Sequence, residues 1–213
     1  MKTNLLLMLT TALLAGACAD SGESTTVTPQ PLTVTTVRNL PADPSTGNDP
    51  QTGRALGTTG RYTLYSLREN RQIANADSAT DRWDIGFQST NIIVNGGAIR
   101  SGRGGVHIHT GLFDELTAVP TGATFAVDAS ASALAIPARS GQGWYNYNRE
   151  LNLVTPIPGR VLVIRTGDGR QYAKLEVLSY YENAPSPVNP ERDRGRFFTF
   201  RFALQPDGSQ QFR

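Results

Sequence analysis

The stretch RVLVIRTGDGRQYAKLEVLSY at residues 160–180 decides the fold class of this chain. Two β-rich runs flank Gly-Asp-Gly at residues 167–169, which is a turn sequence typical of a β-hairpin. The first run, residues 161–164, is apolar on both faces and therefore predicts an interior strand. The second run alternates, with Lys174 and Glu176 between apolar residues, which predicts one buried face and one solvent-exposed face.

Four more segments carry strand patterns. Phenylalanines alternate with other residues from 198 to 204, and β-rich runs occupy residues 62–67, 83–87 and 91–94. Beyond the first 17 residues no long segment shows a helical period, although residues 113–116 fit one short helical turn. The sequence therefore predicts a single antiparallel all-β domain, in which the neighbours Trp83 and Asp84 have structural roles.

The N-terminus has the pattern of a bacterial lipoprotein signal. Met1-Lys2 is followed by an apolar run and by Ala15-Gly16-Ala17, directly before Cys18. Residues 1–17 are thus expected to be a signal peptide, and Cys18 is expected to carry palmitate and other acyl chains that anchor the protein in the membrane. Residues 18–57, rich in Thr, Pro, Ser and Gly, predict a disordered spacer, and residues 58–213 predict the folded domain.

Composition excludes several classes of function. The chain has one cysteine, two methionines and two histidines, with 20 basic and 18 acidic side chains. Because Met1 and Met8 belong to the signal and Cys18 is the expected acylation site, disulfides and thiolate metal sites are excluded from the domain. No basic cluster indicates nucleic-acid binding. No Ser, His and carboxylate arrangement indicates hydrolysis, so we expect a protein that is not an enzyme.

Three blocks together resemble the HmuY family of bacterial surface lipoproteins. The first runs from DRWDIGFQ at residues 81–88 to the Thr-Asn and Asn-Gly-Gly of residues 90–97. The second is GWYNY at residues 143–147, leading to PIPGR at 156–160, and the third is the 165–181 hairpin region. The resemblance implies an HmuY-like all-β fold and a hemophore that binds haem and passes it to a TonB-dependent outer-membrane receptor. It also implies the cell outer membrane, with the domain exposed on the surface.

The resemblance further implies two axial ligands for the haem iron, and His107 and His109 are the only histidines. In an extended strand both imidazoles point to one face, roughly 7 Å apart. Neighbours on one face supply at most one of two axial ligands that must approach the iron from opposite sides. One histidine, alone or opposite Tyr145 or Tyr147, is therefore one interpretation.

Two other interpretations of the histidines remain open. Both imidazoles chelate a non-haem metal ion such as zinc, copper or nickel, together with Asp114 or Glu115. Alternatively, they are solvated side chains on a loop or an edge strand, and the glycines at residues 102, 104, 105 and 111 favour a mobile loop. The alternative function is correspondingly a surface-tethered binding module that has lost haem ligation, or that binds a different ligand or metal ion.

Overall fold

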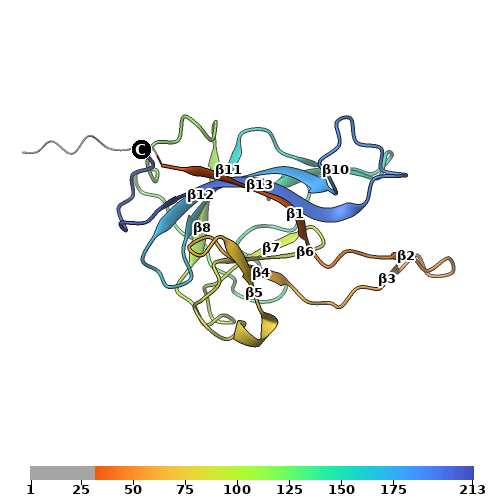
Figure 1. Cartoon of the computed structure of the whole chain (residues 1–213), viewed down its shortest axis with the longest axis horizontal. Coiled ribbons are helices and arrows are strands. Elements are labelled where there is room, and N and C mark those ends of the chain that lie inside the picture. Colours follow the sequence, from red (N-terminus) through yellow and green to blue (C-terminus); the bar gives the residue numbers. More distant parts are fainter. Residues whose placement is uncertain (1–31) are drawn as a thin grey trace, which may run out of the picture.

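The structure is a computed structural model that describes residues 32–213, and its regular secondary structure is almost entirely antiparallel strands (Figure 1). A five-stranded sheet has the order β1-β13-β12-β11-β8, and a four-stranded sheet has the order β5-β4-β6-β7. The five-stranded sheet contains β1 (Val34–Pro41), β8 (Gly105–Thr110), β11 (Arg160–Arg165), β12 (Tyr172–Tyr181) and β13 (Gly195–Gln205). The four-stranded sheet contains β4 (Thr63–Ser66), β5 (Arg71–Ile73), β6 (Ile85–Gln88) and β7 (Asn91–Val94). The predicted all-β antiparallel class is confirmed.

Two small hairpins stand apart from the large sheets. β2 (Gly47–Asn48) pairs with β3 (Ala55–Leu56), and β9 (Tyr145–Asn148) pairs with β10 (Leu153–Pro156). The β2–β3 hairpin forms the tip of an arm that extends from the body of the molecule (Figure 1). The described residues include one 3₁₀ turn, η1 (Asn75–Asp77), and no helix long and apolar enough to cross a membrane.

The hairpin predicted from residues 160–180 is present. Arg165 pairs with Tyr172 across the turn, and the N–H of Gly169 donates to the Thr166 carbonyl at 2.8 Å. β11 lies between β8 and β12, as expected for a strand that is apolar on both faces. The strands predicted around residues 62–67, 83–87, 91–94 and 198–204 are β4, β6, β7 and β13.

The two large sheets enclose the main hydrophobic core. Phe87 from β6 stacks on Phe200 from β13 with ring centroids 5.3 Å apart, and it also packs against Phe198 at 4.8 Å. Leu162 and Ile164 from β11 belong to the same cluster of buried side chains. Burial of a phenylalanine of this kind contributes about 3 kcal/mol or more to the free energy of unfolding.

A second cluster covers the opposite face of the five-stranded sheet. Phe113 and Phe212 pack there against Val161 and Val163. The prediction that Lys174 faces water is wrong, because this cluster covers it and leaves it only 5% exposed. Its Nζ donates to the carbonyls of Phe113 and Leu116, at 2.7 and 3.0 Å. The 113–116 segment does contain one helical turn, closed by a 3.2 Å bond from the Leu116 N–H to the Leu112 carbonyl.

The domain begins earlier than residue 58. β1 lies within the predicted spacer of residues 18–57, yet it pairs with β13, where Val37 opposes Phe200 and Leu40 opposes Phe198. Leu40 is almost fully buried. A composition poor in apolar residues does not exclude a strand whose partner already supplies most of the core. The predicted signal peptide, Cys18 and the first part of the spacer lie outside the described residues.

The glycine-rich segment before β8 is tightly packed, which contradicts the interpretation of a mobile loop. The Oδ1 of Asn95 accepts the N–H of Gly102, and the Asn95 carbonyl accepts the N–H of Gly104, at 3.0 and 2.8 Å. A Cβ on Gly102 would lie 2.4 Å from the Asn95 carbonyl oxygen. The glycines therefore permit close backbone approach, and they fix where β8 begins.

Candidate functional site

His107 and His109 lie on β8, an edge strand of the five-stranded sheet. His107 opposes Val163 and His109 opposes Val161 on β11. Since opposed residues of an antiparallel pair point to the same face, both imidazoles lie on the outer face, beside the second hydrophobic cluster. Both side chains are half-buried. The structure thus places the two histidines as neighbours on one face of an extended strand.

The two imidazoles differ in their surroundings. The Nδ1 of His107 lies 3.4 Å from the carbonyl oxygen of Thr124, a contact that orients the ring. This contact leaves the Nε2 of His107 as the nitrogen available to a metal. The Nε2 of His109 packs against Gly111 so closely that a Cβ built there would come within 2.6 Å of it. His107 is therefore the better placed of the two to bind iron.

The two candidate tyrosines lie elsewhere. Tyr145, at the start of β9, is 7% exposed, and its hydroxyl donates to the Ala138 carbonyl at 3.2 Å. Its ring packs on Trp144 within the main core, on the other side of the five-stranded sheet from the histidines. Tyr147 is exposed, and its hydroxyl bonds to the side chain of Asn152 at 3.0 Å. The structure does not bring either tyrosine opposite a histidine.

The carboxylates proposed as further metal ligands are also separate from the histidines. Asp114 forms an ion pair with Arg201 at 3.2 Å, and Glu115 is exposed. Within residues 32–213, no group of three or more His, Cys, Asp or Glu side chains is arranged to hold a metal ion. Any metal site on β8 would thus use the two imidazoles without a protein carboxylate.

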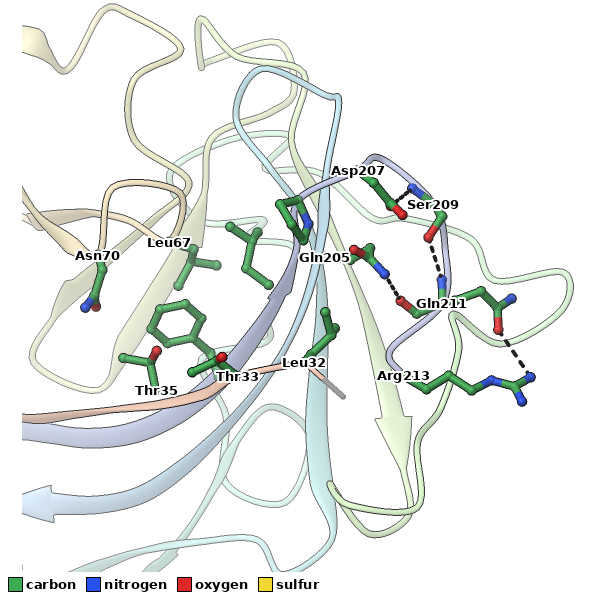
Figure 2. Close-up of a pocket in the computed structure, with 13 residues that line it drawn as sticks. Leu32, Thr33, Thr35, Leu67, Asn70, Gln205, Asp207, Ser209, Gln211 and Arg213 are labelled. Atoms are coloured by element: carbon green, nitrogen blue, oxygen red, sulfur yellow. Dashed lines mark hydrogen bonds between the residues drawn. The ribbon is translucent and has the colours of Figure 1, made fainter. Parts of the chain in front are cut away.

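A cavity of about 790 Å³ lies where β1 begins and β13 ends (Figure 2). Leu67 and Asn70 line one side, and the C-terminal residues up to Arg213 line the other. The side chain of Gln205 donates to the Gln211 carbonyl at 2.7 Å and so holds this C-terminal segment in place. None of the described residues lining this cavity is His, Tyr, Cys or Met. It therefore offers none of the side chains expected to ligate haem iron.

A second large cavity, of about 730 Å³, was not anticipated from the sequence. We name it the arginine cleft. It is lined by residues from four segments: Ser45–Asn48 of the β2–β3 arm, Asn152 and Val154 at β10, Tyr180 and Tyr181 at the end of β12, and Pro190–Arg196. The sequence signal that marks it is an arginine at every second position from 192 to 196.

Comparison with known protein families gives one match, to the family described as HmuY protein, over residues 59–192. The match covers more than half of the chain, and it leaves out β1, the β2–β3 hairpin and all of β13. A comparison with curated proteins finds no match. The family match confirms the resemblance carried by the blocks at residues 81–97, 143–160 and 165–181. The chain belongs to the HmuY family.

Proposed function

We propose that this protein is a surface-tethered binding protein that captures haem and passes it to a TonB-dependent outer-membrane receptor. Membership of the HmuY family is the observation that carries this proposal. The fold is compatible with it, because a rigid antiparallel scaffold can position ligand-binding side chains on its loops and edge strands. The protein is accordingly proposed to bind its ligand without transforming it.

The residues present fit one protein ligand to the haem iron rather than two. His107 offers its Nε2 from the outer face of β8, and His109 on the same face cannot approach the opposite side of a macrocycle. Tyr145 is held in the core by its bond to Ala138. When bound, haem would supply the iron, while this chain would orient one imidazole on β8.

The membrane anchor is a separate part of the proposal. The small residues before Cys18 and the preceding apolar run support cleavage and acylation at that cysteine. Metabolic labelling with a palmitate analogue tests this step, and Cys18→Ala is its control. Incorporation into the wild type but not into Cys18→Ala is expected. Protease added to intact cells tests the location of the domain. A domain exposed on the outer membrane is expected to be degraded, whereas survival of the domain would indicate the periplasmic face.

Titration with haemin tests the ligand directly. A chain that begins at residue 19 lacks the thiol and the signal, and it retains every described residue. Addition of haemin in a neutral buffer is expected to give a saturable shift of the Soret band with one haem per protein. A linear response that never saturates, equal to that of an unrelated β-protein, would rule out haem as the ligand.

A second candidate function is a binding module on the same scaffold that has lost haem ligation and takes another ligand or a metal ion. The side-by-side histidines and the engaged hydroxyl of Tyr145 favour it. Equilibrium dialysis against copper, nickel and zinc ions separates the two candidates. Binding of one metal ion that is lost in His107→Ala, together with an unchanged haemin spectrum, would favour this second function.

A further inference from the structure

The arginine cleft is built by segments that are distant in sequence. The β2–β3 arm forms one wall, and the 190–196 segment that leads into β13 forms another. Tyr180, Tyr181 and Val154 contribute apolar surface between these walls. A volume of about 730 Å³ lies within the range of small-molecule sites, which is roughly 300–1,000 Å³.

The three arginines of the cleft have different partners. Arg194 pairs with Glu182 at 3.0 Å and lies 5.0 Å from the Phe197 ring centroid. Arg196 donates through one Nη to the Asp43 carbonyl at 3.0 Å, and its guanidinium also lies beside the Tyr180 hydroxyl. Among residues 32–213, the Arg192 guanidinium forms no ion pair and no hydrogen bond. The cleft therefore contains guanidinium donors that the fold does not use.

The tyrosine hydroxyls add neutral donors. The N–H of Val154 donates to the Tyr181 hydroxyl oxygen at 3.1 Å, and no described group accepts the hydroxyl's own proton. The ring of Tyr180 packs on Gly195, where a Cβ would come within 2.8 Å of it. Burial raises the pKa of both tyrosines, while Arg196 lowers that of Tyr180. Both hydroxyls therefore remain protonated near neutral pH and can donate to an acceptor.

Two acidic residues also line the cleft. Asp193 is turned toward its own loop, where its Oδ2 accepts the N–H of Asn189 at 2.6 Å. Glu191 is exposed at the rim. Three arginines and two carboxylates line the cleft, and Glu182, just outside the lining, pairs with Arg194. The guanidinium of Arg192 has no carboxylate partner among the described residues, and it is complementary to an anion rather than to a metal ion.

We propose that the arginine cleft binds carboxylate groups of a small ligand. Guanidinium forks and neutral hydroxyl donors match the two oxygens of a carboxylate, and the rings beside them give apolar contact for the rest of the molecule. The inference rests on the proposed function when that ligand is haem. Its two propionates would then be held here as an alternative to ligation of its iron by His107, because the cleft lies at the end of β12 that is remote from His107. This mode of binding needs no axial ligand pair. The other source of the same chemistry is an acidic sugar.

Metal-free protoporphyrin IX isolates the carboxylate contribution, because it carries the propionates but no iron. Its absorbance and fluorescence would be titrated with the chain that begins at residue 19, in parallel with its dimethyl ester, in which both carboxylates are masked. Glucuronic acid, with glucose as its neutral control, is the second arm, followed by calorimetry. The variants are Arg192→Gln and Tyr181→Phe. The exposed Arg170→Gln, away from the cleft, is the matched control.

Protoporphyrin IX is expected to bind about tenfold more tightly than its ester. Arg192→Gln should weaken this binding at least about fivefold, and Arg170→Gln should leave it unchanged. The same arginine dependence for glucuronic acid, with no binding of any porphyrin, supports the carboxylate site and overturns haem as the ligand. The inference is overturned if haemin binding is saturable but has the same affinity in the wild type and in both cleft variants, and if protoporphyrin IX and its ester bind equally well. That result would leave the proposed function standing.

Discussion

Asp84 and Gly167, 83 positions apart, are joined by a 2.7 Å hydrogen bond from the Gly167 N–H to the Asp84 carboxylate. The same fully buried carboxylate accepts the N–H of Leu67 at 2.7 Å and pairs with Arg68 at 3.0 Å. It therefore ties the four-stranded sheet to the turn between β11 and β12. The structural role predicted for Trp83 and Asp84 is confirmed, since Trp83 is also buried.

Asp84→Asn is expected to destabilise the protein by about 2–4 kcal/mol, because an amide must present its NH₂ to one of two backbone donors and cannot neutralise Arg68. Chemical denaturation followed by circular dichroism measures this change. Asp81→Asn, at an exposed side chain, is the control and should stay within about 0.5 kcal/mol of the wild type. Equal stabilities of the two variants would refute the role given to Asp84.

Gly167→Ala is expected to lower the free energy of unfolding at least as much as Asp84→Asn does. A Cβ at this position would lie 2.1 Å from the carbonyl oxygen of Trp83, which is backbone and cannot move aside. Gly60→Ala is the matched comparison, because its Cβ meets nothing and its cost, about 1–2 kcal/mol, comes only from its positive φ. A lower melting temperature for Gly167→Ala than for Gly60→Ala is the expected order.

The boundary of the domain can be tested by truncation. A chain that begins at residue 32 keeps β1, and it is expected to unfold at the same temperature as one that begins at residue 19. A chain that begins at residue 58 removes β1 and uncovers the edge of β13 around Phe198 and Phe200. It is expected to aggregate or to lose its cooperative transition. Cooperative unfolding of the shorter chain at an unchanged temperature would show that β1 is dispensable.

The two histidines are expected to contribute unequally to haem binding. His107→Ala should weaken haemin binding about tenfold or more, since the Thr124 carbonyl orients its ring and leaves Nε2 available. His109→Ala should have a smaller effect, because its Nε2 packs against Gly111. Soret titrations of both variants make the comparison. The reverse order, or no effect from either, would contradict the assignment of His107.

Lys174→Met is expected to destabilise the protein by about 1–3 kcal/mol near neutral pH, because two buried carbonyls lose their donor. Burial lowers the pKa of Lys174 from its usual 10.5, so above the folded-state pKa the unfolded chain binds more protons than the folded one. The stability of the wild type relative to Lys174→Met should therefore rise as the pH approaches 10.5. If the difference in free energy of unfolding between the wild type and Lys174→Met decreased over this pH range, the lowered pKa of Lys174 would be contradicted. Paired denaturation curves measure it.

The strand predictions succeeded where the pattern was local. The alternation in β12 and β13 and the Gly-Asp-Gly turn each depend on a few consecutive residues. The prediction failed at Lys174, because a segment some 60 residues away covers that face. It also failed at β1, whose polar sequence is held as a strand by its pairing with β13.

The candidate site, like the fold, could be predicted from the sequence only in part. The sequence alone determined that the two histidines are two residues apart, that no methionine or thiol remains in the domain, and that the chain carries a lipoprotein signal pattern, because spacing and composition are local properties. Only the tertiary structure decided that Tyr145 lies on the opposite side of the sheet and that Arg192, Arg196 and Tyr181 line one cleft. Sheet pairing brings distant residues together, and no local period encodes which strands pair.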